Sequence, residues 1–369
     1  MAVYIHHIAT RNPEFAYPQA YTRELMKERV GEEREIKAIL HRIYSQSGID
    51  QRYSVLPDFQ EGQTEGFLFT KNGVFNPEPS TGLRNSVYTR EARKMFSLVA
   101  RDVIEQSGLA LHDITHVITV SCTGFYAPGP DYTVVMDLGL ALNTPRFHIG
   151  FMGCYAAFPA LRMAKSFCEA DPNARVLVVS VELCSLHLQF SKQVDAMLGA
   201  SVFADGASAA IVSAHDPIDQ PALRIDQMQT MLAPEGEADM AWTIGDNGFD
   251  MVLTSYVPKI LEMKAEKTIQ PLLEASNLSK DDIDIWAVHP GGRAIVDKVR
   301  DGMGLDESKL EHSRKVLREV GNLSSATILF VLKSILEARH HSDQTLVAMA
   351  FGPGLTIESA VMERVDATP

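Results

Sequence analysis

The sequence predicts an α/β fold made of two similar halves, with mixed, mostly parallel sheets covered by helices. Apolar strand-like segments alternate with amphipathic helix-like segments, an order that favours parallel pairing with helical cover. DITHVITVSCTG (113–124) and DDIDIWAVHPGG (281–292) are similar apolar strands that end in small or turn residues. A polar, proline-containing stretch at 214–223 separates the two regions. We therefore expect one half at 1–215 and the other at 216–369.

The spacing within the halves repeats as well. Ser121 and Cys154 are 33 residues apart, and so are His289 and Asn322. Cys154 and Asn322 each follow a glycine and precede an apolar helix-like run, and a further apolar strand follows each run. If the halves pack about a pseudo-twofold axis, these two residues lie at matched helix N-termini, and His289 ends a central strand near both. The three side chains are then expected to converge.

Bulk composition disfavours several classes of protein. With 369 residues, 46% of them hydrophobic, the chain is long enough to bury a large core. A net charge of −13 opposes binding to phosphate backbones, so nucleic-acid binding is not expected. No signal-peptide pattern and no run of about 18 uncharged apolar residues occurs. We expect a cytoplasmic protein without a membrane span.

The cysteines are expected to be free thiols, because Cys122, Cys154, Cys168 and Cys184 lack any metal-binding spacing and a core of this size needs no disulfide. Cys168 is interpreted as core packing. Cys154 is the candidate nucleophile, since a helix N-terminus and a nearby imidazole both stabilise a thiolate and lower the thiol pKa. Pro159 means that the following helix either kinks or begins late.

His289 and Asn322 each fit two interpretations. His289 lies where a strand passes into a glycine-rich turn, a usual place for a side chain directed into a cleft, but a turn histidine bonded to the backbone fits as well. Asn322 fits an N-cap of the following helix, and that role is compatible with a role in catalysis. A Cys, His and Asn set also occurs in papain-like proteases, but their nucleophile signature is absent here. A protease is therefore disfavoured.

Five segments together resemble the type III polyketide synthases, the chalcone-synthase-like family. They are GFMGCYAAFPALRMA, FADGASAAIV, WAVHPGGRAI, EVGNLSSATILFVL and AFGPGLTIE, and they occur in the family's order. The resemblance implies a duplicated, thiolase-like fold with αβαβα layers. It also implies an acyltransferase in which Cys154 carries the acyl chain as a thioester. His289 and Asn322 would promote malonyl decarboxylation and hold the resulting enolate and thioester oxygens.

The reaction implied by the resemblance is iterative. Malonyl-CoA is condensed with loss of CO₂ onto a starter that arrives as acyl-CoA or acyl-ACP, and the product then cyclises. Two neutral donors beside the malonyl thioester oxygen would stabilise the charge that develops there, so neither a metal nor another cofactor is expected. The resemblance implies a homodimer. The pattern resembles bacterial enzymes that make alkylresorcinols or alkylpyrones from fatty acyl starters more than it resembles plant flavonoid enzymes.

The family's substrate-binding positions also carry over to this sequence. The gatekeepers, usually phenylalanines, correspond to Phe203 and Met251, and a flexible methionine would widen access for a long aliphatic starter. Trp242 replaces a glycine of plant enzymes, and its indole needs one hydrogen-bond acceptor. Ala127 replaces a methionine that family members extend into the partner subunit. Further cavity-lining positions are Cys122, Cys184, His187 and Ser324, and the channel for the pantetheine arm is expected at Gly291, Gly292 and Ala294.

Two alternative functions remain open at this point. Ketoacyl-ACP synthase III shares the three residue types and performs a single condensation with malonyl-ACP, but the HPGG and GPGLT segments favour the polyketide branch. A non-catalytic homologue that serves as a binding or scaffold subunit is the alternative from a different class. Such proteins usually lose catalytic residues, whereas this chain keeps all three.

Overall fold

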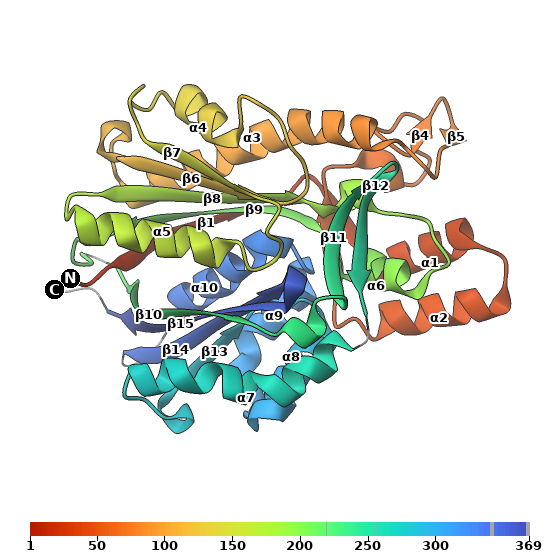
Figure 1. The fold of residues 1–369 in the computed structure, drawn as a ribbon. Coiled ribbons are helices and arrows are strands. Elements are labelled where there is room, and N and C mark those ends of the chain that lie inside the picture. Colours follow the sequence, from red (N-terminus) through yellow and green to blue (C-terminus); the bar gives the residue numbers. More distant parts are fainter. Residues whose placement is uncertain (219, 255, 340–342, 367–369) are drawn as a thin grey trace.

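The fold is built on a mixed sheet (Figure 1), seen here in a computed structural model that describes residues 1–218, 220–254, 256–339 and 343–366. Within these residues the sheet has nine strands. From one edge to the other they are β13 (Ile285–Val288), β14 (Gln344–Gly352), β15 (Thr356–Val365), β10 (Ala222–Leu232), β1 (Tyr4–Arg11), β9 (Asp205–Ser213), β8 (Arg175–Leu183), β6 (His116–Ser121) and β7 (Arg146–Gly150).

Helices and strands alternate as five layers, αβαβα, so the predicted α/β fold class is confirmed (Figure 1). The central layer is α5 (Ala157–Ala170) and α10 (Thr327–Glu337), which share one apolar core with strands on both sides. One outer layer is α3 (Thr81–Ser107) with α4 (Pro130–Leu138). The other is α7 (Val257–Ala275) with α8 (Arg293–Met303), and α9 (Glu311–Val320) packs beside α10.

The expected predominance of parallel strands needs a correction. Parallel pairing occurs at the two ends of the sheet, between β13 and β14 and among β7, β6 and β8. The pairs between them, from β14 through β15, β10, β1 and β9 to β8, are antiparallel. One reason is local, because only residues 353–355 join β14 to β15, and so short a connection allows antiparallel pairing alone.

The sheet consists of two groups of strands, β13, β14, β15 and β10 in one and β1, β9, β8, β6 and β7 in the other. The groups meet at β1 and β10, which share only two residue pairs, Tyr4 with Arg224 and Ile5 with Leu223. Strand β9 ends at Ser213 and β10 begins at Ala222, so most of the polar stretch at 214–223 lies between the two groups in the chain, and its last two residues belong to β10. The division of the chain at 215 and 216 stays a prediction.

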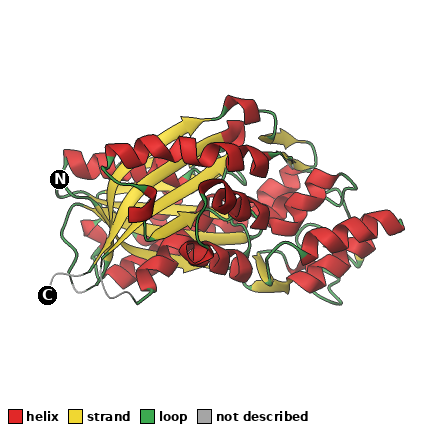
Figure 2. Ribbon diagram, turned by 90° about the horizontal axis from the view of Figure 1, so that it is seen from below, coloured by secondary structure: helices red, strands yellow, loops and turns green. Residues whose placement is uncertain are grey.

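A mainly helical region extends from the end of the sheet opposite the chain termini (Figures 1 and 2). It contains α1 (Gln19–Val30), α2 (Arg34–Ser45) and α6 (Val194–Val202), which pack together around a small apolar cluster. Short antiparallel strand pairs flank these helices: β2 (Phe15–Pro18) with β3 (Gln51–Ser54), β4 (Thr70–Lys71) with β5 (Val74–Phe75), and β11 (Met240–Gly245) with β12 (Gly248–Leu253). Among the described residues, no helix is both long and apolar enough to cross a membrane.

Helix α5 begins late, which resolves the question raised by Pro159. Its first residue is Ala157, so Pro159 lies in the first turn, where a helix tolerates the missing N–H. Its buried residues recur at helical spacing, including Ala157, Leu161 and Cys168. Cys168 is fully buried in the central core, in agreement with its interpretation as packing.

Truncation of Leu161 tests the central layer. Its side chain is fully buried in the core that both strand groups share, so Leu161→Ala should lower the free energy of unfolding by about 2–5 kcal/mol. Met263→Ala on α7 is the control, because that side chain is 58% exposed and its loss should change stability by less than about 0.5 kcal/mol. Urea denaturation measures both values, and equal effects would contradict the assignment of this core.

Candidate active site

One large cavity, with a volume of about 530 Å³, lies where the carboxyl ends of the parallel strands meet the helical region. Cys154, His289 and Asn322 all line it. Cys154 follows β7, His289 follows β13, and Asn322 precedes α10, so the three residues come from both strand groups. The structure thus brings together the three side chains that the sequence singled out.

The loop that carries Cys154 depends on glycine. Gly153 has φ +85°, and a Cβ there would lie 2.5 Å from Cδ of Pro353 in the turn between β14 and β15. Gly352 likewise lies against the ring of Tyr155. The nucleophile's loop is therefore packed against a turn made by the other end of the chain. Cys154 itself lies three residues before the first residue of α5.

Asn322 is held through both its backbone and its side chain. Its N–H donates to the carbonyl of Val202 (2.9 Å), and its carbonyl accepts from the N–H of Ala204 (2.9 Å). Its Oδ1 accepts from the N–H of Ser324 (2.8 Å), and its Nδ2 donates to the carbonyl of Gly291 (3.1 Å). The N-cap interpretation is wrong, because α10 begins at Thr327 and its N-cap is Ala326. A role in the cavity is open to Asn322, because its Nδ2 carries a second hydrogen that a ligand can receive.

His289 differs from an ordinary turn histidine. Its backbone N–H donates to the carbonyl of Met349 (2.7 Å), which fixes the main chain, but neither ring nitrogen has a hydrogen-bond partner among the described residues. The residue is 1% exposed and lines the cavity. Burial lowers the pKa of His289 to about 3, so the imidazole is neutral at physiological pH. A buried, unpaired, neutral imidazole can both donate and accept a proton.

The expected lowering of the Cys154 pKa is not found. Burial raises the pKa of Cys154 to about 11, and hydrogen bonds from Ser324 and Asn322 offset only part of that effect. The sequence argument relied on a charged imidazole and a helix N-terminus. Burial also keeps His289 neutral, so at rest the cavity holds a neutral thiol and a neutral imidazole.

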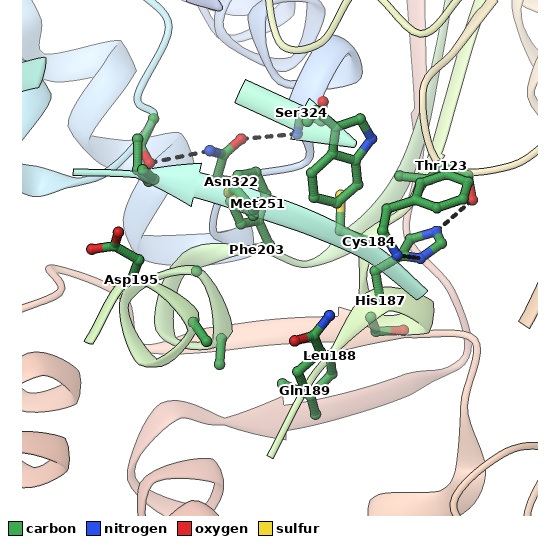
Figure 3. A pocket seen from close by; sticks show the side chains of 18 of the residues that line it. Thr123, Cys184, His187, Leu188, Gln189, Asp195, Phe203, Met251, Asn322 and Ser324 are labelled. Carbon is green, nitrogen blue, oxygen red and sulfur yellow. Dashed lines mark hydrogen bonds between the residues drawn. The ribbon is translucent and has the colours of Figure 1, made fainter. Parts of the chain in front are cut away.

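Phe203 and Met251 lie close together in the cavity (Figure 3). Both are near Gly199 of α6, where an added Cβ would lie 3.2 Å from Cε of Met251 and 3.9 Å from Cδ2 of Phe203. Phe203 also forms a bridge with Asn322, so its position is tied to that of the catalytic candidate. The absence of a side chain at residue 199 leaves room for both gatekeeper candidates.

Trp242 closes one side of the cavity as part of an aromatic group. Its Nε1–H donates to the carbonyl of Cys122 (2.9 Å), which supplies the acceptor that the indole needs. Its ring meets His187 and Phe249 edge-on, and those two rings are stacked with centroids 3.9 Å apart. His187 is fixed in turn by Thr123, whose carbonyl lies 2.8 Å from Nε2, and by the N–H of Phe249, which donates to Nδ1.

Most of the other predicted substrate-binding residues line the cavity, and three do not. Ala127 is exposed on the surface and is joined to Pro128 by a cis peptide bond. Gly292 and Ala294 lie at the start of α8 and are not part of the cavity wall, although Gly291 before them and Ile295 after them are. The residues found in the wall are Cys122, Cys184, His187, Phe203, Trp242, Met251, Gly291 and Ser324.

Glu182 is a residue that the sequence reasoning missed. It is fully buried on β8 and accepts hydrogen bonds from the N–H of Cys122 (3.0 Å) and from the hydroxyls of Thr123 and Ser325. Burial raises its pKa. This carboxyl group lies directly behind the cavity wall and positions the segment that carries Cys122. The sequence feature that could have indicated Glu182 is that a single acidic residue interrupts the apolar run VLVVSVEL.

Among the described residues, no group of three or more His, Cys, Asp and Glu side chains is arranged to hold a metal ion. The polar groups that face the cavity near Cys154 are the imidazole of His289, the amide of Asn322 and the hydroxyl of Ser324. These groups can hold a thioester oxygen and transfer a proton.

Comparison with known families identifies the chain. The model of the chalcone and stilbene synthase N-terminal domain matches residues 3–217, and that of the C-terminal domain matches residues 224–366. The chain belongs to this family. The resemblance seen in the five sequence segments is thereby confirmed.

Solved structures of type III polyketide synthases are similar to this family member over almost its whole length. PKS-I from the brown alga Ectocarpus siliculosus is 29% identical, with a TM-score of 0.90 and coverage of 99% of this chain and 98% of that chain. The 1,3,6,8-tetrahydroxynaphthalene synthase from Streptomyces coelicolor A3(2) is 27% identical, with a TM-score of 0.87 and coverage of 99% and 100%.

A third structure supports the fold alone. It is the C-terminal type III polyketide synthase domain of Steely1 from Dictyostelium, which is 24% identical, with a TM-score of 0.90 and coverage of 99% and 100%. Together with the family match, these structures make this chain an acyltransferase of the type III polyketide synthase class with a thiolase-like fold.

The protonation state of the synthase's Cys154 can be tested by alkylation with iodoacetamide. Only the thiolate reacts, and with a pKa of about 11 its fraction should rise by about tenfold per pH unit from pH 6 to pH 10. Modification is followed by peptide mass spectrometry. In His289→Gln the slope should stay the same, because a neutral imidazole contributes no charge to the thiolate.

A plateau in the wild-type alkylation rate below pH 8 that disappears in His289→Gln would contradict this assignment. That result would mean that a charged imidazole stabilises the thiolate, as the sequence argument first suggested.

Proposed function

We propose that this synthase carries an acyl starter on Cys154 and extends it by repeated decarboxylative condensation with malonyl-CoA. The single observation that supports this best is the buried imidazole of His289, whose two nitrogens are unpaired in the same cavity as Cys154 and Asn322. A buried polar group without a hydrogen-bond partner lowers the stability of the fold by about 1–3 kcal/mol. Such a group is therefore expected where a bound ligand supplies the missing partner.

The neutral thiol of Cys154 and the neutral imidazole of His289 can load the starter together. The thiol of Cys154 transfers its proton to the neutral imidazole of His289 as its sulfur attacks the acyl thioester carbon. The tetrahedral intermediate then expels the CoA thiolate, which takes the proton from His289 and leaves as a thiol. The products are an acyl-Cys154 thioester and free coenzyme A, and His289 is neutral again. This is base-assisted nucleophilic catalysis, in which the thiolate exists only during the reaction.

Decarboxylation needs stabilisation of negative charge rather than a base. The second Nδ2–H of Asn322 and an N–H of His289 would both donate to the thioester oxygen of bound malonyl-CoA. As CO₂ leaves, the electrons of the broken carbon–carbon bond form an enolate whose charge lies on that oxygen. Preorganised hydrogen-bond donors stabilise such a developing charge far more strongly in a buried site than in water. The enolate carbon then attacks the acyl thioester and releases the Cys154 thiolate, which takes up a proton from water, because the thiol's own proton left with coenzyme A during loading.

The substrate is proposed as a fatty acyl starter, and the product as an alkylresorcinol or alkylpyrone. Met251 lies against Gly199, at a gatekeeper position where the family usually has a bulkier phenylalanine ring. The flexible methionine side chain supports a long flexible starter over a planar one. Gly291 supports a pantetheine channel, because it lines the cavity beside His289. Delivery from coenzyme A or from a carrier protein, the need for no further cofactor and a cytoplasmic location stay predictions.

A homodimer is also proposed. Strand β7 is an edge of the sheet, and beside it exposed apolar side chains gather on and after α4, with Met136 47% and Leu142 84% exposed. An open edge strand with apolar neighbours is typical of an interface. Ala127 lies exposed a few residues before α4, in keeping with its expected position near a partner subunit.

Replacement of the nucleophile tests the proposed reaction. Cys154→Ala should lose acyl loading and lower product formation by at least about 1,000-fold, because the proposed acyl carrier is removed. Intact-protein mass spectrometry after incubation with an acyl-CoA detects the added acyl group. Cys168→Ala is the control, because that thiol lies in the central core and should not affect loading. Acyl transfer at the normal rate by Cys154→Ala would disprove the assignment.

The number of malonyl units in the product separates this function from the single condensation of a ketoacyl-ACP synthase III. More than one unit per starter is expected.

The dimer is tested by placing charges on its proposed surface. The double variant Met136→Glu and Leu142→Glu should sediment as a monomer where the wild-type protein sediments as a dimer, because two carboxylates would be buried without partners. Met263→Glu on α7, also an exposed methionine, should leave the dimer intact. A wild-type monomer, or a dimer unaffected by the double variant, would contradict the proposal.

A further inference from the structure

Two segments that are distant in the sequence supply much of the cavity wall. Residues 184–189 follow β8 and include His187 (Figure 3). The β11–β12 hairpin contributes Trp242, Phe249 and Met251. The two segments touch directly, because the N–H of Phe249 donates to Nδ1 of His187 (3.1 Å) and their rings are stacked. Their relative position therefore sets the shape of the cavity on this side.

A buried arginine behind this wall is bonded to the first segment. Arg84 is 1% exposed and is not itself part of the cavity wall. Its Nη1 donates to the carbonyls of Leu186 and of Leu188 (3.0 Å), the residues on either side of His187. Its Nε donates to the carbonyl of Pro79, just before α3 (2.8 Å). One guanidinium group thus holds the main chain on both sides of a cavity-lining side chain.

The turn of the β11–β12 hairpin lies against the same guanidinium group. Gly248 has φ +117°, and a Cβ there would lie 3.1 Å from Nε and 3.3 Å from Cζ of Arg84. Thr81, the first residue of α3, is bonded to this turn as well. Its N–H donates to the carbonyl of Asp246 (2.8 Å), and its Oγ1 accepts from the N–H of Gly248 (2.8 Å). The first turn of α3 therefore contacts both segments of the wall (Figure 1).

The position of Arg84 is unfavourable for a cation. Burial lowers the pKa of Arg84 to about 10, because water no longer surrounds the charge. Arg84 is also the fourth residue of α3, close to the positive end of the helix dipole. Three carbonyl oxygens and the ring of Phe69, whose centroid lies 5.3 Å from Cζ, offset part of this cost. An apolar side chain would avoid the cost, but it could not bind three carbonyls at once.

We propose that Arg84 is a positioning residue for the synthase reaction, which fixes residues 184–189 and the β11–β12 hairpin relative to each other from behind the cavity wall. Thr81 supports it by holding the hairpin turn. Arg84 touches no substrate and acts through the wall residues. Its effect on product formation rests on the proposed extension of an acyl group on Cys154. Its effect on the wall itself does not depend on that reaction.

The indole of Trp242 reports on the wall independently of catalysis. The chain has two tryptophans, and Trp286 is fully buried in the core that it shares with α7 and α8, so Trp286→Phe leaves Trp242 as the only indole. In this background, Arg84→Met should raise the acrylamide quenching constant by at least about twofold, because the hairpin moves more freely. Arg364→Met is the matched control. Arg364 is 4% exposed but lies outside this cavity, so its loss should leave quenching unchanged.

Thr81→Val is a second variant that decides the question if Arg84→Met does not fold. It keeps the shape of the side chain but removes the acceptor for the N–H of Gly248, so quenching should again increase. Thr89→Val is its control, because the hydroxyl of Thr89 donates within α3 to the carbonyl of Asn85 (2.9 Å). Unchanged quenching in the deciding variant, or an equal increase in its control, would overturn the inference.

Activity with hexadecanoyl-CoA and malonyl-CoA separates positioning from a general loss of stability. In Arg84→Met, acyl loading of Cys154 should stay within about twofold of the wild-type rate, while product formed per loaded acyl group falls by at least about tenfold, because misplaced wall residues no longer orient the growing chain. Arg84→Lys keeps the charge but lacks the planar fork, so it should restore part of that activity. Equal losses of loading and product in Arg84→Met would mean a structural role alone and overturn the inference. Absence of loading in the wild-type protein would instead overturn the proposed function, and the quenching result would still stand.

Discussion

The site depends on a short backbone bridge between two distant parts of the chain. The N–H of Asn322 donates to Val202 and its carbonyl accepts from Ala204, so Phe203 and Asn322 are held side by side. On the other side of the same segment, Arg52 donates to the carbonyl of Phe203 and to the end of α6. One peptide segment therefore fixes the catalytic amide, a gatekeeper ring and the helix that borders the substrate. Loss of this bridge would disturb binding and chemistry together.

Burial sets the chemistry of the site more strongly than charge does. The environment that makes Asn322 and His289 effective donors also disfavours ions, so it raises the pKa of Cys154 and lowers that of His289. A permanently charged pair would be more nucleophilic at rest, but a charged imidazole could no longer accept the thiol proton. A neutral pair serves both proton transfer and charge stabilisation, and one site can then perform loading and condensation in turn.

The sequence was sufficient to predict the α/β fold class and the convergence of Cys154, His289 and Asn322, because equal spacing in two similar halves carries that information. The relative direction of the strands was harder to predict, since an apolar run such as QTLVAMAFG is compatible with both parallel and antiparallel pairing. The pKa of Cys154 depends on how many atoms surround it, which only the packed structure reveals. Ala294 was expected beside the substrate, but it is its neighbour Ile295 that lines the cavity, a one-residue difference that only the first turn of α8 decides. Glu182 was missed because its partners, Thr123 and Ser325, are distant in sequence.

The contact between Gly153 and Pro353 bears on how the enzyme becomes active during its synthesis. The ribosome makes Cys154 long before the turn between β14 and β15, and until that turn forms, the loop of the nucleophile lacks the surface that shapes it. On the nascent chain the exposed thiol ionises more readily than in the folded site, where burial raises its pKa, but it lacks the groups of His289 and Asn322 that would assist acyl transfer. The complete site therefore exists only after the last strands of the chain have been made and have folded.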